Sequence, residues 1–195
     1  MLSIIYKTTI KNILRSPTFF MILIILVLVT IQGASYGFYV GDDAPDMVIQ
    51  IWDYVECVEN ACSAKLMMYI IPIFVSFLTV LILKRDYGDS FFEIEKASGI
   101  SAFKYILGRL LALITVSFTI MFAMNLLLIH WYVFSRGGVQ NMGIVEYIID
   151  SLIRVFFIDV SIALPGIIFY ITLTYFIGTL LNSEIAAAVV SVTYA

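Results

Sequence analysis

Long uncharged apolar runs alternate with short charged segments along the whole chain. Four runs hold 26, 18, 26 and 24 residues without a charge: Ser16 to Gly41, Leu66 to Leu83, Leu110 to Ser135 and Val160 to Ser183. A helix needs ~20 apolar residues to cross ~30 Å of hydrocarbon, so the pattern predicts four membrane-spanning helices. A fifth run begins at Ile185 and stops at Ala195. At ~1.5 Å per residue it reaches about halfway across, so we expect the natural chain to continue.

The predicted fold is an all-α, multi-pass membrane protein in one domain. Membrane β-strands would alternate apolar and polar residues, whereas these runs are continuously apolar, which favours a helical bundle. The predicted elements are an interfacial helix 2–15, span one 17–40, an outer acidic loop 41–65, span two 66–83, a cytoplasmic segment 84–101, span three 102–134, an outer amphipathic segment 143–158, span four 159–181 and part of span five 184–195.

Composition excludes an ordinary soluble domain. Hydrophobic residues make up 62% of the 195 positions, charged residues only 13%, and the mean hydropathy is +1.04. The first apolar run is far longer than the ~7 to 15 residues of a signal-peptide core, so we expect it to remain as an anchor.

The distribution of lysine and arginine predicts the orientation. Eight of the eleven cationic residues lie before span one or in the segment from Lys84 to Arg109, which ends in the first turns of span three. Cytoplasmic loops are enriched in these residues. We therefore expect the N-terminus on the cytoplasmic side of the cell membrane and the acidic loop on the outer side. The net charge of −3 comes from that outer loop and does not indicate a nucleic-acid partner.

Aromatic residues mark the predicted outer ends of spans one and three. They are Tyr36, Phe38, Tyr39, Trp131, Tyr132 and Phe134. Such belts sit at the membrane surface, and His130, the only histidine, fits the same ring better than a metal site or proton relay.

Two cytoplasmic elements have helix signals. One face of the N-terminal segment carries Lys7, Lys11 and Arg15, and the opposite side carries most of Ile5, Ile10, Ile13 and Leu14. This pattern predicts a helix in the inner headgroup layer. Ordinary basic flanking residues would give the same pattern. Ser16-Pro17 then predicts a helix restart.

The stretch "DYGDSFFEIEKASGISAFKYILGRLL" predicts a short helix followed by the foot of span three. Ser90 and Glu93 form a capping box, Gly99 is a left-handed stop, and Ser101 caps the next helix. Lys104 and Arg109 are expected at the lipid surface, because a cation at the bilayer centre costs roughly 2.5 to 3.5 kcal/mol. Held between two spans, this short helix could transmit a push from a soluble partner. A solvated loop is the alternative.

Three segments together resemble the ABC type-2 membrane family, the permeases of bacterial export transporters. They are "KNILRSPTFFMILIIL", "KRDYGDSFFEIEKASGISAFKYILGRLLAL" and "FIGTLLNSEIAAAVVSV", in family order and spacing. The resemblance implies a half-transporter of six spans that pairs with a second half, identical or different. It also implies that the segment between spans two and three docks on a cytoplasmic ABC ATPase.

Residue by residue, the resemblance assigns Lys7, Lys11 and Arg15 to an interfacial connecting helix. It assigns ATPase docking to Ser90, Phe91, Phe92, Glu93, Ile94, Glu95, Lys96, Ser98 and Gly99. The chain departs from the family pattern at its end, where the rest of span five and span six are missing.

No catalytic chemistry is predicted for this chain. It has no G-x-x-x-x-G-K-[ST] nucleotide-binding motif, so ATP hydrolysis is expected on another polypeptide. It also has no H-E-x-x-H metalloprotease motif and no cofactor motif. Its spans hold almost no ionisable groups, which argues against an ion-coupled carrier.

Three further features remain open. Cys57 and Cys62 lie in the outer loop, where a disulfide is allowed but needs a local turn. In the second outer segment Asp150 and Arg154 are spaced for an ion pair. Pro72 and Pro165-Gly166 predict kinks in spans two and four.

The leading hypothesis is the membrane subunit of an ATP-driven exporter. The alternative is a non-transporting scaffold or immunity protein that binds a partner within the bilayer. The substrate is not specified by the sequence.

Overall fold

The computed structural model describes residues 2–37, 65–88, 99–135 and 142–181. Over these ranges the chain forms six helices and no strand. The helices are α1 (Leu2–Arg15), α2 (Pro17–Gly37), α4 (Lys65–Gly88), α6 (Ala102–Ser135), α7 (Ile144–Ser161) and α8 (Ala163–Leu181). The prediction of an all-helical fold is therefore confirmed.

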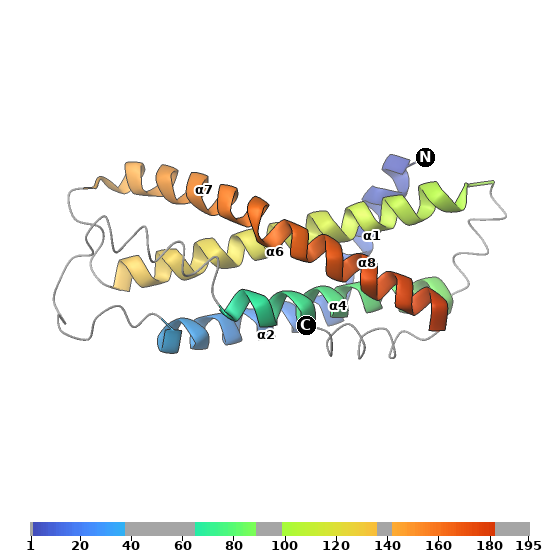
Figure 1. Cartoon of the computed structure of the whole chain (residues 1–195), viewed down its shortest axis with the longest axis horizontal. Coiled ribbons are helices and arrows are strands. Elements are labelled where there is room, and N and C mark those ends of the chain that lie inside the picture. The colour runs from blue at the N-terminus through green and yellow to red at the C-terminus, as the bar shows by residue number, and fades with distance from the viewer. Residues whose placement is uncertain (1, 38–64, 89–98, 136–141, 182–195) are drawn as a thin grey trace.

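The long helix α6 runs the length of the molecule and organises the others (Figure 1). Its first half packs against α1, and its second half packs against α7. The rings of Tyr147 and His130 meet edge to face, as do those of Phe156 and Phe122, so α7 runs antiparallel to α6. Helix α8 crosses α6 and packs most extensively against α4. As a result α1, the end of α4, the start of α6 and the end of α8 lie together at one end of the bundle (Figure 1).

Two of the described helices are long and apolar enough to cross a membrane. They are Ala102–Trp131 within α6 and Ala163–Leu180 within α8. Helix α1 and the first part of α2 together meet the same criteria, but a 67° bend separates them, and Pro72–Leu83 of α4 is a shorter apolar stretch. The described part thus offers two spans, or three if the bent pair is one span. These apolar helices indicate a membrane protein, while the number of passes and their orientation stay predictions.

The bend between α1 and α2 follows from Ser16-Pro17. Pro17 has no amide hydrogen to donate and suits the first turn of a helix, where that hydrogen would have no partner. The amide of Ser16 donates to the carbonyl of Ile13 at 3.1 Å, and the amide of Phe19 donates to the carbonyl of Ser16 at 3.1 Å. One helix therefore closes as the next opens, which confirms the predicted restart.

A second break separates α7 from α8 at Ile162, whose amide still donates to the carbonyl of Ile158 at 2.9 Å. Pro165 lies in the first turn of α8, so the kink predicted within span four is a helix boundary instead. The cause is the same residue, because Pro165 cannot donate to the carbonyl of Ser161, four residues earlier, and its ring crowds that carbonyl. Pro72 lies inside α4, whose helix continues across it.

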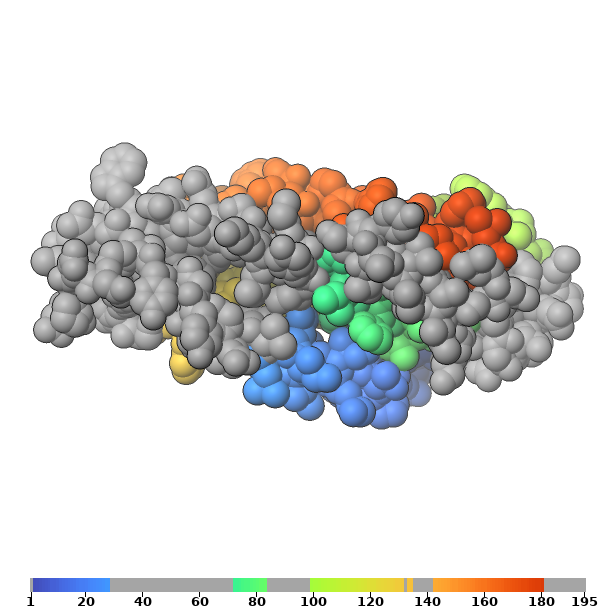
Figure 2. All heavy atoms as spheres, turned by 60° about the horizontal axis from the view of Figure 1, so that its bottom comes forward, coloured from blue at the N-terminus to red at the C-terminus, as the bar shows by residue number. Residues whose placement is uncertain are grey.

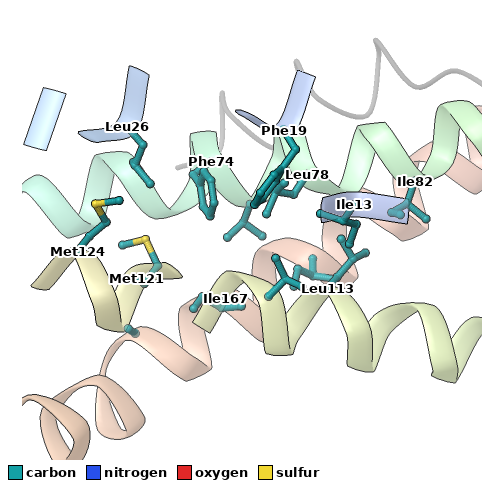
Figure 3. Close-up of a cluster of buried hydrophobic side chains, with 14 residues drawn as sticks. Ile13, Phe19, Leu26, Phe74, Leu78, Ile82, Leu113, Met121, Met124 and Ile167 are labelled. Carbon is teal, nitrogen blue, oxygen red and sulfur yellow. The ribbon is translucent and has the colours of Figure 1, made fainter. Parts of the chain in front are cut away.

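In the described part of the chain, the larger apolar cluster of the core draws on five helices (Figure 3). Phe19 and Leu26 of α2 face Phe74 and Leu78 of α4, while Ile13 of α1 reaches the same cluster. Met121, Met124 and Leu113 of α6 and Ile167 of α8 close the other side.

Large apolar side chains also cover the outside of the helices. On α2 the exposed ones are Phe20, Met21, Ile24, Ile25 and Leu28, and this helix forms an edge of the molecule in Figure 2. A soluble monomer rarely exposes so continuous an apolar face, whereas lipid solvates it without cost.

Candidate functional site

The predicted ATPase-docking segment enters α6 through a well-defined boundary. Gly99 adopts a positive φ of 78°, the left-handed conformation expected of a helix stop. The amide of Lys104 donates to Oγ of Ser101 at 3.4 Å, as expected for an N-cap. The left-handed conformation of Gly99 and the Ser101 cap are confirmed, whereas the helix that Gly99 was predicted to end lies outside the described residues. Ser90 to Ser98, including the proposed capping box, lie outside the described residues.

Helix α1 has the two faces that its sequence predicts. Lys7, Lys11 and Arg15 are exposed, whereas Ile5 and Ile13 are buried. Thr9 completes the buried stripe, while Leu14, expected on that side, is 47% exposed. The buried stripe faces mainly α6 rather than lipid, so α1 is an integral part of the bundle.

Arg109 corrects the sequence interpretation. It was expected at the lipid surface, yet it is only 2% exposed, in the angle between α1 and α6. Its Nη1 donates to Oγ1 of Thr9 at 3.0 Å and its Nη2 donates to the hydroxyl of Tyr105 at 2.8 Å. The guanidinium carbon also lies 4.9 Å from the centre of the Tyr105 ring, a cation–π distance. Lys104 remains exposed, as predicted.

The two helices approach closely beside Arg109 because Gly108 has no side chain. A Cβ atom at Gly108 would lie 2.9 Å from Cγ2 of Ile5, closer than real contacts allow. Nearby, the hydroxyl of Tyr6 donates to Oγ1 of Thr115 at 3.2 Å. We call Ile5, Thr9, Tyr105, Gly108 and Arg109 the foot cluster, since they join α1 to the first turns of α6.

A second polar contact lies deeper in the bundle and was missed by the sequence analysis. Nδ2 of Asn125 on α6 donates to Oδ1 of Asp159 on α7 at 2.6 Å, and both residues are fully buried. From the sequence, Asp159 was expected at the start of span four, and no partner was assigned to it. The available signal was an asparagine in the middle of span three and an aspartate at the edge of span four, which nothing in the sequence brings together.

The pair leaves two oxygens without hydrogen bonds. Within the described part of the chain, neither Oδ1 of Asn125 nor Oδ2 of Asp159 has a hydrogen-bond partner, although both atoms are buried. Unsatisfied acceptors of this kind are rare in folded proteins and call for an explanation.

A third polar contact joins α4 to α8. The hydroxyls of Ser76 and Thr174 lie 3.3 Å apart and are buried. Together with the foot cluster and the Asn125–Asp159 pair, it means that the α1–α6, α6–α7 and α4–α8 contacts each include a buried polar pair.

The other predicted features have mixed outcomes. Nε of Arg154 and Oδ2 of Asp150 form the expected ion pair at 2.7 Å. His130 packs its ring 5.2 Å from that of Tyr147, and the described residues contain no group of three or more metal-ligating side chains. Trp131 and Phe134 are exposed. The side chains of Tyr36, Phe38, Tyr39, Cys57, Cys62 and Tyr132 lie outside the described part.

No protein-family model, curated protein or solved structure matches the chain.

Proposed function

We propose that the chain is the membrane-spanning subunit of an ATP-driven exporter of the ABC type. The observation that supports it best is the foot cluster, which fixes α1 to α6 directly after the segment expected to meet the ATPase. That segment, 89–98, connects Gly88 at the end of α4 to Gly99 just before α6. A force applied to it therefore acts on both helices at once.

The helix contacts suit transmission of such a force. Helix α6 has 34 residues and, at ~1.5 Å per residue, is a rod of about 50 Å. Because Arg109 bonds to Thr9, α1 follows the first turns of α6, and because Asn125 bonds to Asp159, α7 follows its second half. On the other side, α4 carries α8 through their shared interface and the Ser76–Thr174 contact. Rigid-body movement of packed helices is a common way to open a path across a bundle.

In this proposal ATP is hydrolysed by a separate cytoplasmic ATPase, and a second permease half completes the path. The N-terminus and the segment 89–98 face the cytoplasm of a bacterial cell. Lys7, Lys11 and Arg15, exposed on α1, lie against anionic headgroups of the inner leaflet. This chain contributes no catalytic residue and no cofactor site.

Co-purification with the ATPase tests the proposal. The full-length protein, extracted from its native membrane, should bring down an ATP-binding subunit identifiable by mass spectrometry. Phe92→Asp and Glu93→Arg should abolish this association. The matched control is Glu146→Arg, at an exposed position of α7 at the other end of the bundle. It should leave the association with the ATPase intact.

Two results would refute the proposal. One is a full-length protein that brings down no ATPase. The other is a Phe92→Asp, Glu93→Arg variant that keeps both association and transport. Recovery of a membrane partner without any ATPase would favour a scaffold or immunity protein instead.

A further inference from the structure

The Asn125–Asp159 pair carries an inference that is independent of the proposed transport function. Asp159 is an acidic residue with no exposed surface, and it lies between apolar helices. An ionised carboxylate in such a place needs a cationic partner or several hydrogen-bond donors. Among the described residues it has one donor, Nδ2 of Asn125.

The charged groups of the surrounding helices do not supply a partner. On α7 itself, Arg154 is bonded to Asp150 and Glu146 is exposed. On α6, Lys104 and Arg109 lie near its start and His130 bonds through Nδ1 to the carbonyl of Leu126 at 2.6 Å. Helix α8 (Ala163–Leu181) contains no Asp, Glu, Lys, Arg or His.

A single proton on Asp159 would satisfy both orphan atoms. A carboxylic acid and a primary amide carry complementary groups: the amide N–H donates to one carboxyl oxygen and the acid O–H donates to the amide oxygen. The first bond is present, and the two atoms that would make the second, Oδ2 of Asp159 and Oδ1 of Asn125, are the two without partners in the described structure. A metal ion fits less well, because hard cations take six or more oxygen ligands and the described residues contain no group of three or more His, Cys, Asp or Glu side chains.

We propose that Asn125 and Asp159 form a proton-binding site between α6 and α7, with Asp159 in its carboxylic acid form while α7 is docked on α6. Loss of the proton breaks the O–H bond, leaves its electron pair on Oδ2 and transfers H⁺ to water. The resulting carboxylate faces an amide oxygen that receives no hydrogen bond from it, so α7 binds α6 less tightly. The site lies three residues before the α7–α8 break at Ile162, where a change in the position of α7 can be absorbed.

Infrared difference spectroscopy on the full-length protein in lipid nanodiscs tests this site. The wild type at mildly acidic pH should show the C=O stretch of a protonated carboxylic acid, and this band should disappear as the pH is raised. Asp159→Asn should remove the band, and Asn125→Leu should shift it, because the acid loses its amide partner. Asp150→Asn, the same change on a partly exposed residue of the same helix that pairs with Arg154, is the control and should leave it unchanged.

Thermal stability provides a second readout if a variant folds poorly. A group that is protonated in the folded state but ionised in the unfolded state stabilises the protein at low pH and loses this effect as pH rises. The melting temperature of the wild type should therefore fall with rising pH by more than that of Asp159→Asn, in which the group cannot ionise. Three infrared results would overturn the proposal. The wild type could lack the carboxylic acid band, or Asp159→Asn could keep it. The band could also be replaced by a carboxylate band that depends on added Na⁺ or Ca²⁺.

Discussion

The foot cluster and the Asn125–Asp159 pair bury polar groups in the same helix, α6, by opposite means. At the foot, a cation is surrounded by neutral hydroxyls and an aromatic face from α1 and its own helix. Sixteen positions further along α6, about 24 Å away at a rise of ~1.5 Å per residue, the amide of Asn125 meets the carboxyl group of Asp159 from α7. Hydroxyls can satisfy a guanidinium that stays charged, whereas one amide cannot satisfy a carboxylate that stays charged.

This contrast suggests different roles for the two contacts. Arg109 keeps its charge at every physiological pH, so the foot cluster is a permanent attachment of α1. The state of Asp159 depends on whether it holds a proton, so the attachment of α7 can vary. The substitutions below test whether the first contact is the stronger and the less sensitive to conditions.

Arg109→Met should produce the largest loss of stability. It removes the charge-assisted hydrogen bonds to Thr9 and Tyr105 and leaves two buried hydroxyls with fewer partners. A hydrogen bond to a charged group is worth about 1.5 to 3 kcal/mol, so the loss of two such bonds should cost at least about 3 kcal/mol. Equilibrium unfolding in mixed micelles should show this decrease, with Lys104→Met, the same change at an exposed position five residues earlier, within about 0.5 kcal/mol of the wild type. Equal effects of the two substitutions would contradict the burial of Arg109.

Asn125→Leu should be the next most disruptive change. It preserves an apolar core but removes the donor to Oδ1 of Asp159. Leaving a buried polar group unsatisfied costs about 1 to 3 kcal/mol. The control is Thr119→Val, because the exposed Thr119 bonds only to the carbonyl of Thr115 in its own helix. A loss no larger than that of the control would mean that the pair adds nothing to the docking of α7.

Local signals in the sequence predicted the structure well wherever the interacting residues are close in the chain. Gly99, Ser101, Ser16-Pro17 and the Asp150–Arg154 pair each act within four residues, so their geometry follows from the helix itself. The helical fold followed equally from the length and continuity of the apolar runs.

The buried polar contacts could not be predicted, because each joins distant segments. Thr9 and Arg109 are 100 residues apart, Ser76 and Thr174 are 98 apart, and Asn125 and Asp159 are 34 apart. Periodicity tells which residues share a face of one helix but not which helix covers that face. Arg109 was expected to be exposed at the lipid surface for this reason: its sequence neighbours do not show that α1 covers it and supplies a hydroxyl.

Gly108→Ala tests the close packing of the foot cluster separately from its hydrogen bonds. The new methyl would lie 2.9 Å from Cγ2 of Ile5, and such overpacking costs about 1 to 3 kcal/mol. Alanine also favours a helix over glycine by up to about 1 kcal/mol, so the net loss should be roughly 1 kcal/mol. Gly166→Ala in α8, where nothing lies within 4 Å of the new atom, should instead raise stability.

The opposite signs of these two glycine substitutions are the diagnostic result. Ile5→Ala in the Gly108→Ala background should recover part of the lost stability, because the clashing methyl group is gone. If Gly108→Ala were stabilising like Gly166→Ala, α1 would not be seated against α6 as closely as the foot cluster requires.

Ser76→Ala should have the smallest effect, since both partners in the α4–α8 contact are neutral hydroxyls. Their 3.3 Å separation is long for a hydroxyl hydrogen bond, and hydrogen bonds between membrane helices average about 0.6 kcal/mol. Thr172→Val is the control, because the exposed hydroxyl of Thr172 bonds only to the carbonyl of Ile168 in its own helix. If Ser76→Ala lowered the free energy of unfolding by more than about 2 kcal/mol, the strongest polar contact would lie between α4 and α8. The contacts of α6 at Arg109 and Asn125 would then not be the stronger ones. A loss near 0.6 kcal/mol would instead mean that α4 and α8 are held together by apolar packing, which allows them to slide while the foot cluster holds α1 in place.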